Sequence, residues 1–109
     1  MSKLQDRLLQ DLEKLIDHLE KYEESHWSGF FRKVYQLVDN GQLRGVEALK
    51  EMPYGGMGGF SDLVICAENG HKIEKNQLRF VNDELMRLGN KVMKTNDKLM
   101  KELRQKKLM

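Results

Sequence analysis

The stretch LQDRLLQDLEKLIDHLEKY, residues 4–22, decides the fold class of this 109-residue chain. Its leucines recur in steps of three and four residues and therefore line one face of a helix, while charged side chains fill the opposite face. Ser2 stands at the expected N-cap, and the pattern predicts a helix to about Glu24, with Ser25 and His26 capping the next segment. A helix with such a face must bury it, so the rest of the chain has to supply the packing partners.

Three further helices are predicted downstream. The aromatic segment 26–39 has helical spacing and stops at Asn40 and Gly41, and a shorter helix over 43–51 ends before Pro53. The last helix begins at residue 74 or 76 and runs to about 106, with a heptad seam over residues 78–99. The apolar run LVICA, residues 63–67, fits a strand or a helical turn, and we expect a helix because no second strand candidate exists to pair with it.

These elements predict an all-α fold of four to five helices. The long first and last helices pack lengthwise, and the aromatic second helix and a Gly-rich loop fill the core. The length allows a single core, which we assign to residues 1–93. Residues 94–109 form a basic extension of the last helix, whose end must project or pair because the helix is longer than such a globule is wide.

The charges are polarised along the sequence. The net charge is +2 overall, which makes nucleic acid an unlikely partner, but residues 2–25 carry −3 and residues 94–109 carry +4. A protein that captures a partner quickly needs a patch of complementary charge. We select the acidic first helix as that patch, with the candidate partner-binding residues Asp11, Asp17, Glu20, Glu23 and Glu24.

No residue pattern indicates catalysis. A nucleophile–base pair would need Cys66, Ser25, Ser28 or Ser61 beside a histidine, yet no motif pairs one of them with His18, His26 or His71. The histidines lack the spacing of a helical zinc site, and the glycines of the segment 53–62 match neither a P-loop nor a dinucleotide fingerprint. We therefore expect no enzyme activity, no catalytic residue, no metal site and no cofactor.

The segment PYGGMGGFSD, residues 53–62, combines four glycines with apolar anchors. Together with the His-Trp pair at 26–27 and the segment GVEAL at 45–49, it resembles a family of small bacterial helical proteins of unknown function that carry a Tyr-Gly-Gly-Met-Gly-Ser-Phe-Asn-Asp motif. The resemblance covers residues 4–93, with Gly59 in place of the serine and Ser61 in place of the asparagine. The predicted structural motif comprises Trp27, Tyr54, Gly55, Gly56, Met57, Gly58, Phe60 and Asp62.

Small proteins of this kind are often encoded beside secreted toxins and look like immunity proteins, which bind a toxin and neutralise it. The resemblance thus implies that the partner is a cognate toxin domain. The single cysteine and the absence of a signal sequence or an apolar stretch of membrane-spanning length predict a cytoplasmic protein with no membrane contact. Two alternatives remain. A homodimer could use the seam over residues 85–99, or a nucleic-acid-associated factor could use the basic extension.

Overall fold

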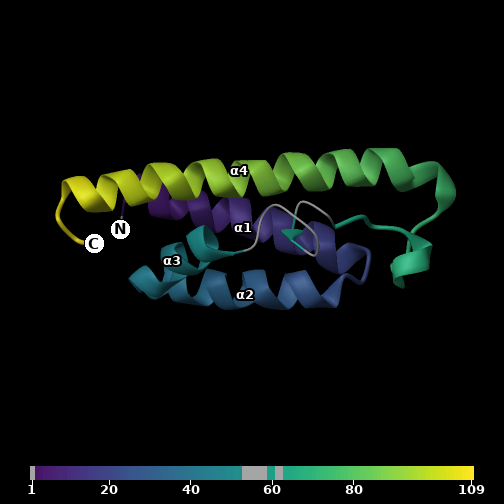
Figure 1. Ribbon diagram of the computed structural model, residues 1–109, viewed down its shortest axis with the longest axis horizontal. Coiled ribbons are helices and arrows are strands. Elements are labelled where there is room, and N and C mark those ends of the chain that lie inside the picture. Colours follow the sequence, from purple (N-terminus) through teal and green to yellow (C-terminus); the bar gives the residue numbers. More distant parts are fainter. Residues whose placement is uncertain (1, 53–58, 61–62) are drawn as a thin grey trace.

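The computed structural model describes residues 2–52, 59–60 and 63–109 and places them in the α-helices α1 (Lys3–Lys21), α2 (Ser25–Asp39), α3 (Leu43–Glu51) and α4 (Leu78–Gln105). Two 3-10 turns, Ala67–Asn69 and Lys75–Gln77, precede α4, and the described residues contain no strand. α1 packs on α4 and on α2, and α3 packs on α2 and α4 (Figure 1). The predicted all-α fold with lengthwise packing of the first and last helices is confirmed.

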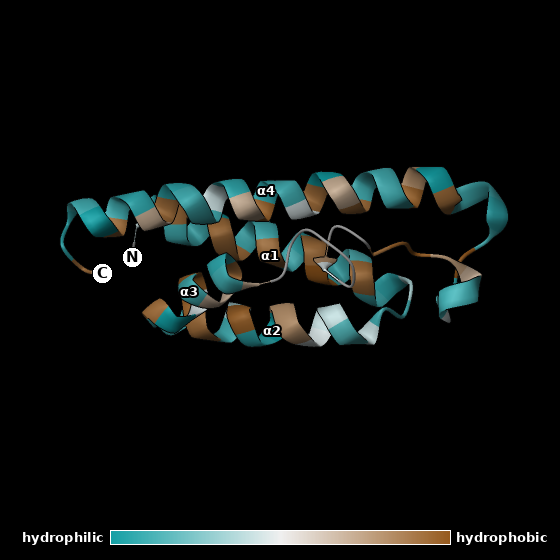
Figure 2. Cartoon of the chain, in the orientation of Figure 1, coloured by the Kyte–Doolittle hydropathy of each residue, from teal (hydrophilic) through white to brown (hydrophobic). Residues whose placement is uncertain are grey.

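The core lies between α1 and α4. Leu8, Leu12, Leu15 and Leu19 of α1 are completely buried, and the seam of α4 faces them with Val81, Leu85, Leu88, Val92 and Leu99. Hydrophobic and hydrophilic residues alternate along each helix with the period that this packing requires (Figure 2). The seam is therefore occupied within the chain, and the extension after residue 94 belongs to the packed part of α4, because Leu99 and Met100 are buried.

Three helices end with the same backbone motif. The residue after the C-cap adopts a positive φ, which is +60° at Glu23, +72° at Gly41 and +56° at Lys107. The next N–H donates to a carbonyl five residues back, for example from Glu24 to Leu19 at 2.9 Å. The predicted stop at Gly41 is confirmed, as is the cap at Ser2, whose hydroxyl accepts from the Gln5 N–H.

Aromatic rings fill the space between α2 and α4. The ring of Phe60, which is 4% exposed, meets Trp27 and Phe31 edge-on at centroid distances of 5.2 Å. Gly89 of α4 makes room for it, because a Cβ there would lie 2.6 Å from the Phe60 ring. Trp27 and Phe60 thus lie in the core as expected. The other residues of the predicted structural motif lie outside the described residues: Tyr54, Gly55, Gly56, Met57, Gly58 and Asp62.

The expected helix over residues 63–67 is wrong, because residues 63–66 have no regular structure and only a 3-10 turn begins at Ala67. Side chains replace the missing second strand. The Asn82 amide accepts from the Ile65 N–H at 2.7 Å and donates to the Ile65 carbonyl at 3.0 Å. The Asn69 amide donates to the Val64 carbonyl in the same way. An isolated extended segment is stable here because its backbone groups are satisfied.

Candidate protein-binding face

The structure divides the acidic residues selected from the sequence into two groups. Asp11 and Glu24 are buried and bonded within the chain, whereas Asp17, Glu20 and Glu23 are exposed. The sequence pattern placed all of them on the solvated face of the first helix. Only the three exposed carboxylates are therefore accessible to a partner.

Asp11 joins α1 to α4. Its carboxylate is 3% exposed, accepts from the Thr95 hydroxyl at 2.6 Å and lies 3.7 Å from the Lys91 ammonium. A sequence signal for this contact existed, because Asp11 is three residues after Leu8 and four before Leu15, inside the apolar stripe. Thr95 occupies the equivalent position in the seam of α4. Two polar residues in two facing stripes indicate a mutual contact.

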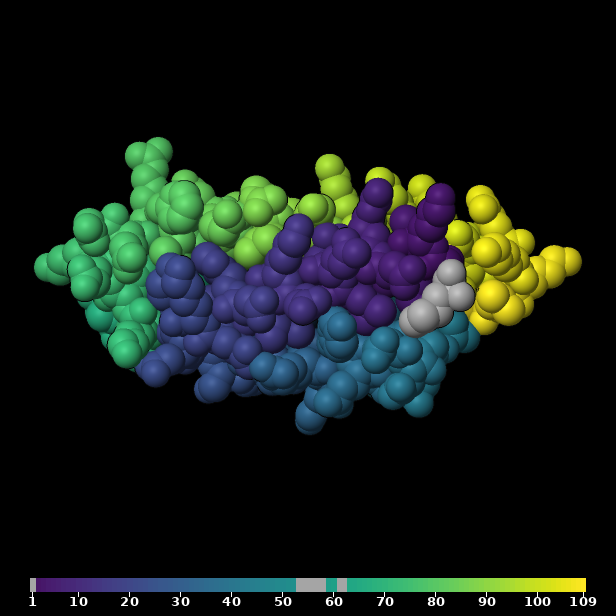
Figure 3. All heavy atoms as spheres, turned by 180° about the vertical axis from the view of Figure 1, so that it is seen from behind, coloured from purple at the N-terminus to yellow at the C-terminus, as the bar shows by residue number. Residues whose placement is uncertain are grey.

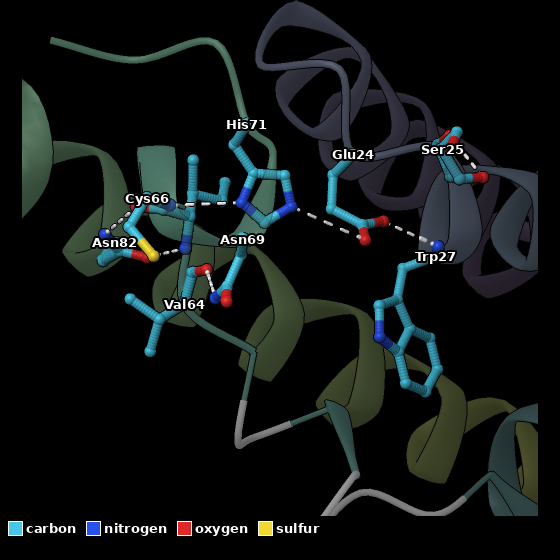
Figure 4. Close-up of polar contacts among 10 residues, drawn as sticks. Glu24, Ser25, Trp27, Val64, Cys66, Asn69, His71 and Asn82 are labelled. Atoms are coloured by element: carbon cyan, nitrogen blue, oxygen red, sulfur yellow. Dashed lines mark hydrogen bonds and ion pairs between the residues drawn. The ribbon is translucent and has the colours of Figure 1, made fainter.

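Glu24 fixes the start of α2 and the chain beyond α3 (Figure 4). One carboxylate oxygen accepts from the Trp27 N–H at 2.7 Å, so Glu24 is the N-cap that Ser25 and His26 were expected to provide. The other oxygen lies 3.7 Å from Nε2 of buried His71. Nδ1 of His71 accepts from the Cys66 N–H at 3.1 Å, which assigns the ring hydrogen to Nε2. Glu24 and His71 are thus structural residues.

The exposed acids face a groove between α1 and α2. Glu13, Asp17 and Glu20 follow one another on α1 at steps of four and three residues, and α2 contributes Arg32, Tyr35 and Gln36 opposite them. Figure 3 shows both helices side by side on this face. A hollow of about 350 Å³ is lined by Glu13, Ile16, Asp17, Arg32, Tyr35 and Gln36, and we call it the α1–α2 groove. Glu20 lies outside this lining. Sequence reasoning missed Glu13 and every α2 residue of the groove.

The charges of the α1–α2 groove are incompletely neutralised. Arg32 donates to the Glu20 carboxylate at one end, and this hydrogen bond, together with the charge of Glu20, raises the pKa of the guanidinium. Among the described residues, neither Glu13 nor Asp17 has an ion-pair partner within 4.0 Å. The charge of Asp17 acts on Arg32 only at longer range, where it adds slightly to the raised pKa of the guanidinium.

Tyr35 lines the same hollow as these acids and is half-buried. Burial raises the pKa of its phenol, and the charges of Glu13 and Asp39 raise it further. The hydroxyl therefore stays protonated at neutral pH as a hydrogen-bond donor, and the ring offers an apolar surface beside two carboxylates. Such a combination suits a Lys or Arg side chain from another protein, since aromatic faces and carboxylates both attract cations.

Among the described residues, no side-chain hydrogen bond joins Cys66, Ser25 or Ser28 to a histidine. Cys66 is half-buried, and His71 contacts its backbone N–H. The half-buried His18 bonds the Val81 carbonyl, and His26 is exposed. Within residues 2–52, 59–60 and 63–109, no group of three potential ligands could hold a metal ion. In the same residues, every helix is too short or too polar to cross a membrane.

Comparisons with known proteins identify a family but no activity. Residues 20–74, about half of the chain, match a family model described as a domain of unknown function (DUF6966). The matched region contains α2, α3 and the segment that Glu24 and His71 hold in place. The chain matches no curated protein and no solved structure.

Proposed function

The chain belongs to the DUF6966 family of domains of unknown function, and we propose that it is a non-enzymatic protein-binding module that acts as an immunity protein. It binds a bacterial toxin domain in the cytoplasm and neutralises it by covering a basic surface. The partner contacts the α1–α2 groove.

One observation carries this proposal. Glu13 and Asp17 are exposed carboxylates without ion-pair partners in the described chain, and they line the same hollow as the half-buried Tyr35. Aromatic and arginine residues supply much of the binding energy in protein interfaces, and complementary charge accelerates association. The groove offers an aromatic residue, Tyr35, and an arginine, Arg32, in the same hollow as the charged carboxylates. Toxins that act on nucleic acids or anionic cofactors have basic clefts, which this groove complements.

The experiment is a growth assay in bacteria. The product of the reading frame adjacent to this gene is expressed alone, with the wild-type chain, and with the double variant Glu13→Lys/Asp17→Lys. The proposal predicts that expression alone stops growth, that the wild type restores it, and that the double variant restores it at least tenfold less well in plating efficiency. An adjacent product that is harmless, or that the wild type leaves toxic, would contradict the proposal.

A matched control separates the groove from net charge. Glu68→Lys/Asp83→Lys makes the same change in charge at two exposed acids outside the α1–α2 groove, neither of which has an ion-pair partner in the described chain. It should protect as well as the wild type. Equal loss of protection in both double variants would show that overall charge, and not the groove, decides binding.

A further inference from the structure

A second cavity lies at the opposite end of the bundle, where α1 begins, α2 turns into α3, and α4 ends. It is a hollow of about 380 Å³ that opens to solvent, and its volume is within the range of small-ligand sites. Its walls are predominantly apolar, formed by Val38, Leu43, Val46, Leu99, Leu103 and Leu108. The walls from α1 and α4 lie outside the family match at residues 20–74, so this cavity depends on parts of the chain that the match does not cover.

The chain reverses direction after α4, and the returning residues close one side of the cavity. The positive φ of Lys107 reverses the chain, and the Leu108 N–H donates to the Leu103 carbonyl at 2.8 Å. Leu108 thereby returns to the cavity wall while more than half of its surface remains exposed, and Leu43 on the facing helix is also exposed. The apolar wall thus continues out to the solvent.

Two charged side chains line the cavity, Lys106 and Glu102, and the stretch of chain around them is basic. Residues 101–107 contain four basic side chains and one acid. Lys106 lines the mouth, is 59% exposed and lies 3.9 Å from Glu102, at the limit of an ion pair. Exposed pairs of this kind are weak, so the ammonium can turn to a ligand. Of the uncharged polar side chains that line the cavity, Ser2 and Gln5 are already bonded within the chain.

We propose that this cavity binds a monomeric anionic amphiphile of the fatty-acid class. The hydrocarbon chain enters between the ends of the helices, and the carboxylate pairs with Lys106 at the mouth. A methylene group is about as large as a water molecule, whose share of liquid volume is about 30 Å³. A cavity of 380 Å³ therefore holds roughly a dozen carbon atoms. Lys106 exchanges Glu102 for the anionic head, and the volume of the hollow limits the length of the chain.

The test is a calorimetric titration of the whole protein with saturated fatty acids of increasing length, each below its micelle concentration. Saturable one-to-one binding is expected, with affinity that rises about fourfold per added methylene and levels off near dodecanoate. The methyl NMR signals of Leu43 and Leu108 should shift during the titration. Absent or non-saturable binding would overturn the proposal, as would an affinity that keeps rising with length.

Two variants and two further probes sharpen the test. Lys106→Glu should weaken dodecanoate binding about tenfold, whereas Lys101→Glu, the same charge change at a lysine that does not line the cavity, should leave it unchanged. Leu103→Trp, which fills the cavity, should move the plateau to shorter acids, and unchanged thermal unfolding verifies its fold. Equal affinity for dodecyltrimethylammonium would overturn the charge argument. Binding to anionic phospholipid vesicles without binding to the free acids would overturn the proposal and show that this end of the molecule binds a membrane surface.

Discussion

The substitution Asp11→Ala tests whether this carboxylate holds the fold together or meets a partner. The structure assigns it to the fold, since Asp11 is buried between α1 and α4 and accepts from the Thr95 hydroxyl at 2.6 Å. Alanine at this position leaves the hydroxyl without its acceptor. It also leaves the Lys91 ammonium without the carboxylate that lies 3.7 Å away.

The magnitude follows from these two contacts. A buried hydrogen bond to a charged group contributes about 1.5–3 kcal/mol. Lys91 is half exposed, so its ion pair adds less than about 1 kcal/mol. Alanine regains about 0.5 kcal/mol through its higher helix propensity. Asp11→Ala should therefore lower the free energy of unfolding by about 2–3 kcal/mol, which moves the urea midpoint down by about 1–2 M.

The assay is equilibrium unfolding in urea, followed by the fluorescence of the buried Trp27. Asp17→Ala is the matched control, since it removes an exposed carboxylate from the same helix and should change stability by less than about 0.5 kcal/mol. Thr95→Val should cost no further stability in the Asp11→Ala background. A loss below about 1 kcal/mol for Asp11→Ala, or equal losses for Asp11→Ala and Asp17→Ala, would refute the reasoning.

Three other substitutions test local features. Glu23→Gly should raise the free energy of unfolding by about 1 kcal/mol, because an L-residue with a φ of +60° is strained; unchanged thermal stability would contradict this. Gly45→Ala should destabilise by about 1–3 kcal/mol despite its better helix propensity, since its Cβ would lie 2.7 Å from Val38 Cγ2; a higher melting temperature would disprove the close approach. Glu13→Gln should lower the raised pKa of Tyr35, because it removes a negative charge that opposes the phenolate. NMR titration of the ring against pH measures this pKa, and identical titration curves for the wild type and Glu13→Gln would exclude this electrostatic effect.

Periodicity was sufficient to locate the four α-helices, but capping chemistry misplaced the boundary between the first two, because α1 ends at Lys21 and Glu24 caps α2. The helix predicted over 43–51 has those bounds, and the one predicted over 26–39 begins one residue earlier, at Ser25. The last helix begins later than expected, because residues 75–77 form a 3-10 turn first. These elements depend on local spacing, which the sequence displays directly.

The conformation of segment 63–66 and the burial of Glu24 depend on contacts that local spacing does not reveal. The extended segment is stable because Asn82, seventeen residues away, bonds both backbone groups of Ile65. Glu24 is buried because it caps α2 and faces His71, which is distant in sequence. The same limit applies to the candidate site. Asp17 and Glu20 were named from charge alone and Glu13 was missed, and Tyr35 and Arg32 join these acids only when α2 packs beside α1.

The dissociation constant for the toxic product of the adjacent reading frame, measured for the wild type and for Asp17→Lys at low and high salt, tests the central claim most directly. We expect the substitution to weaken binding at least tenfold at low salt, mainly through slower association, with the difference shrinking as salt screens the charges. An affinity that Asp17→Lys leaves unchanged at low salt would place the partner on another face and contradict the account.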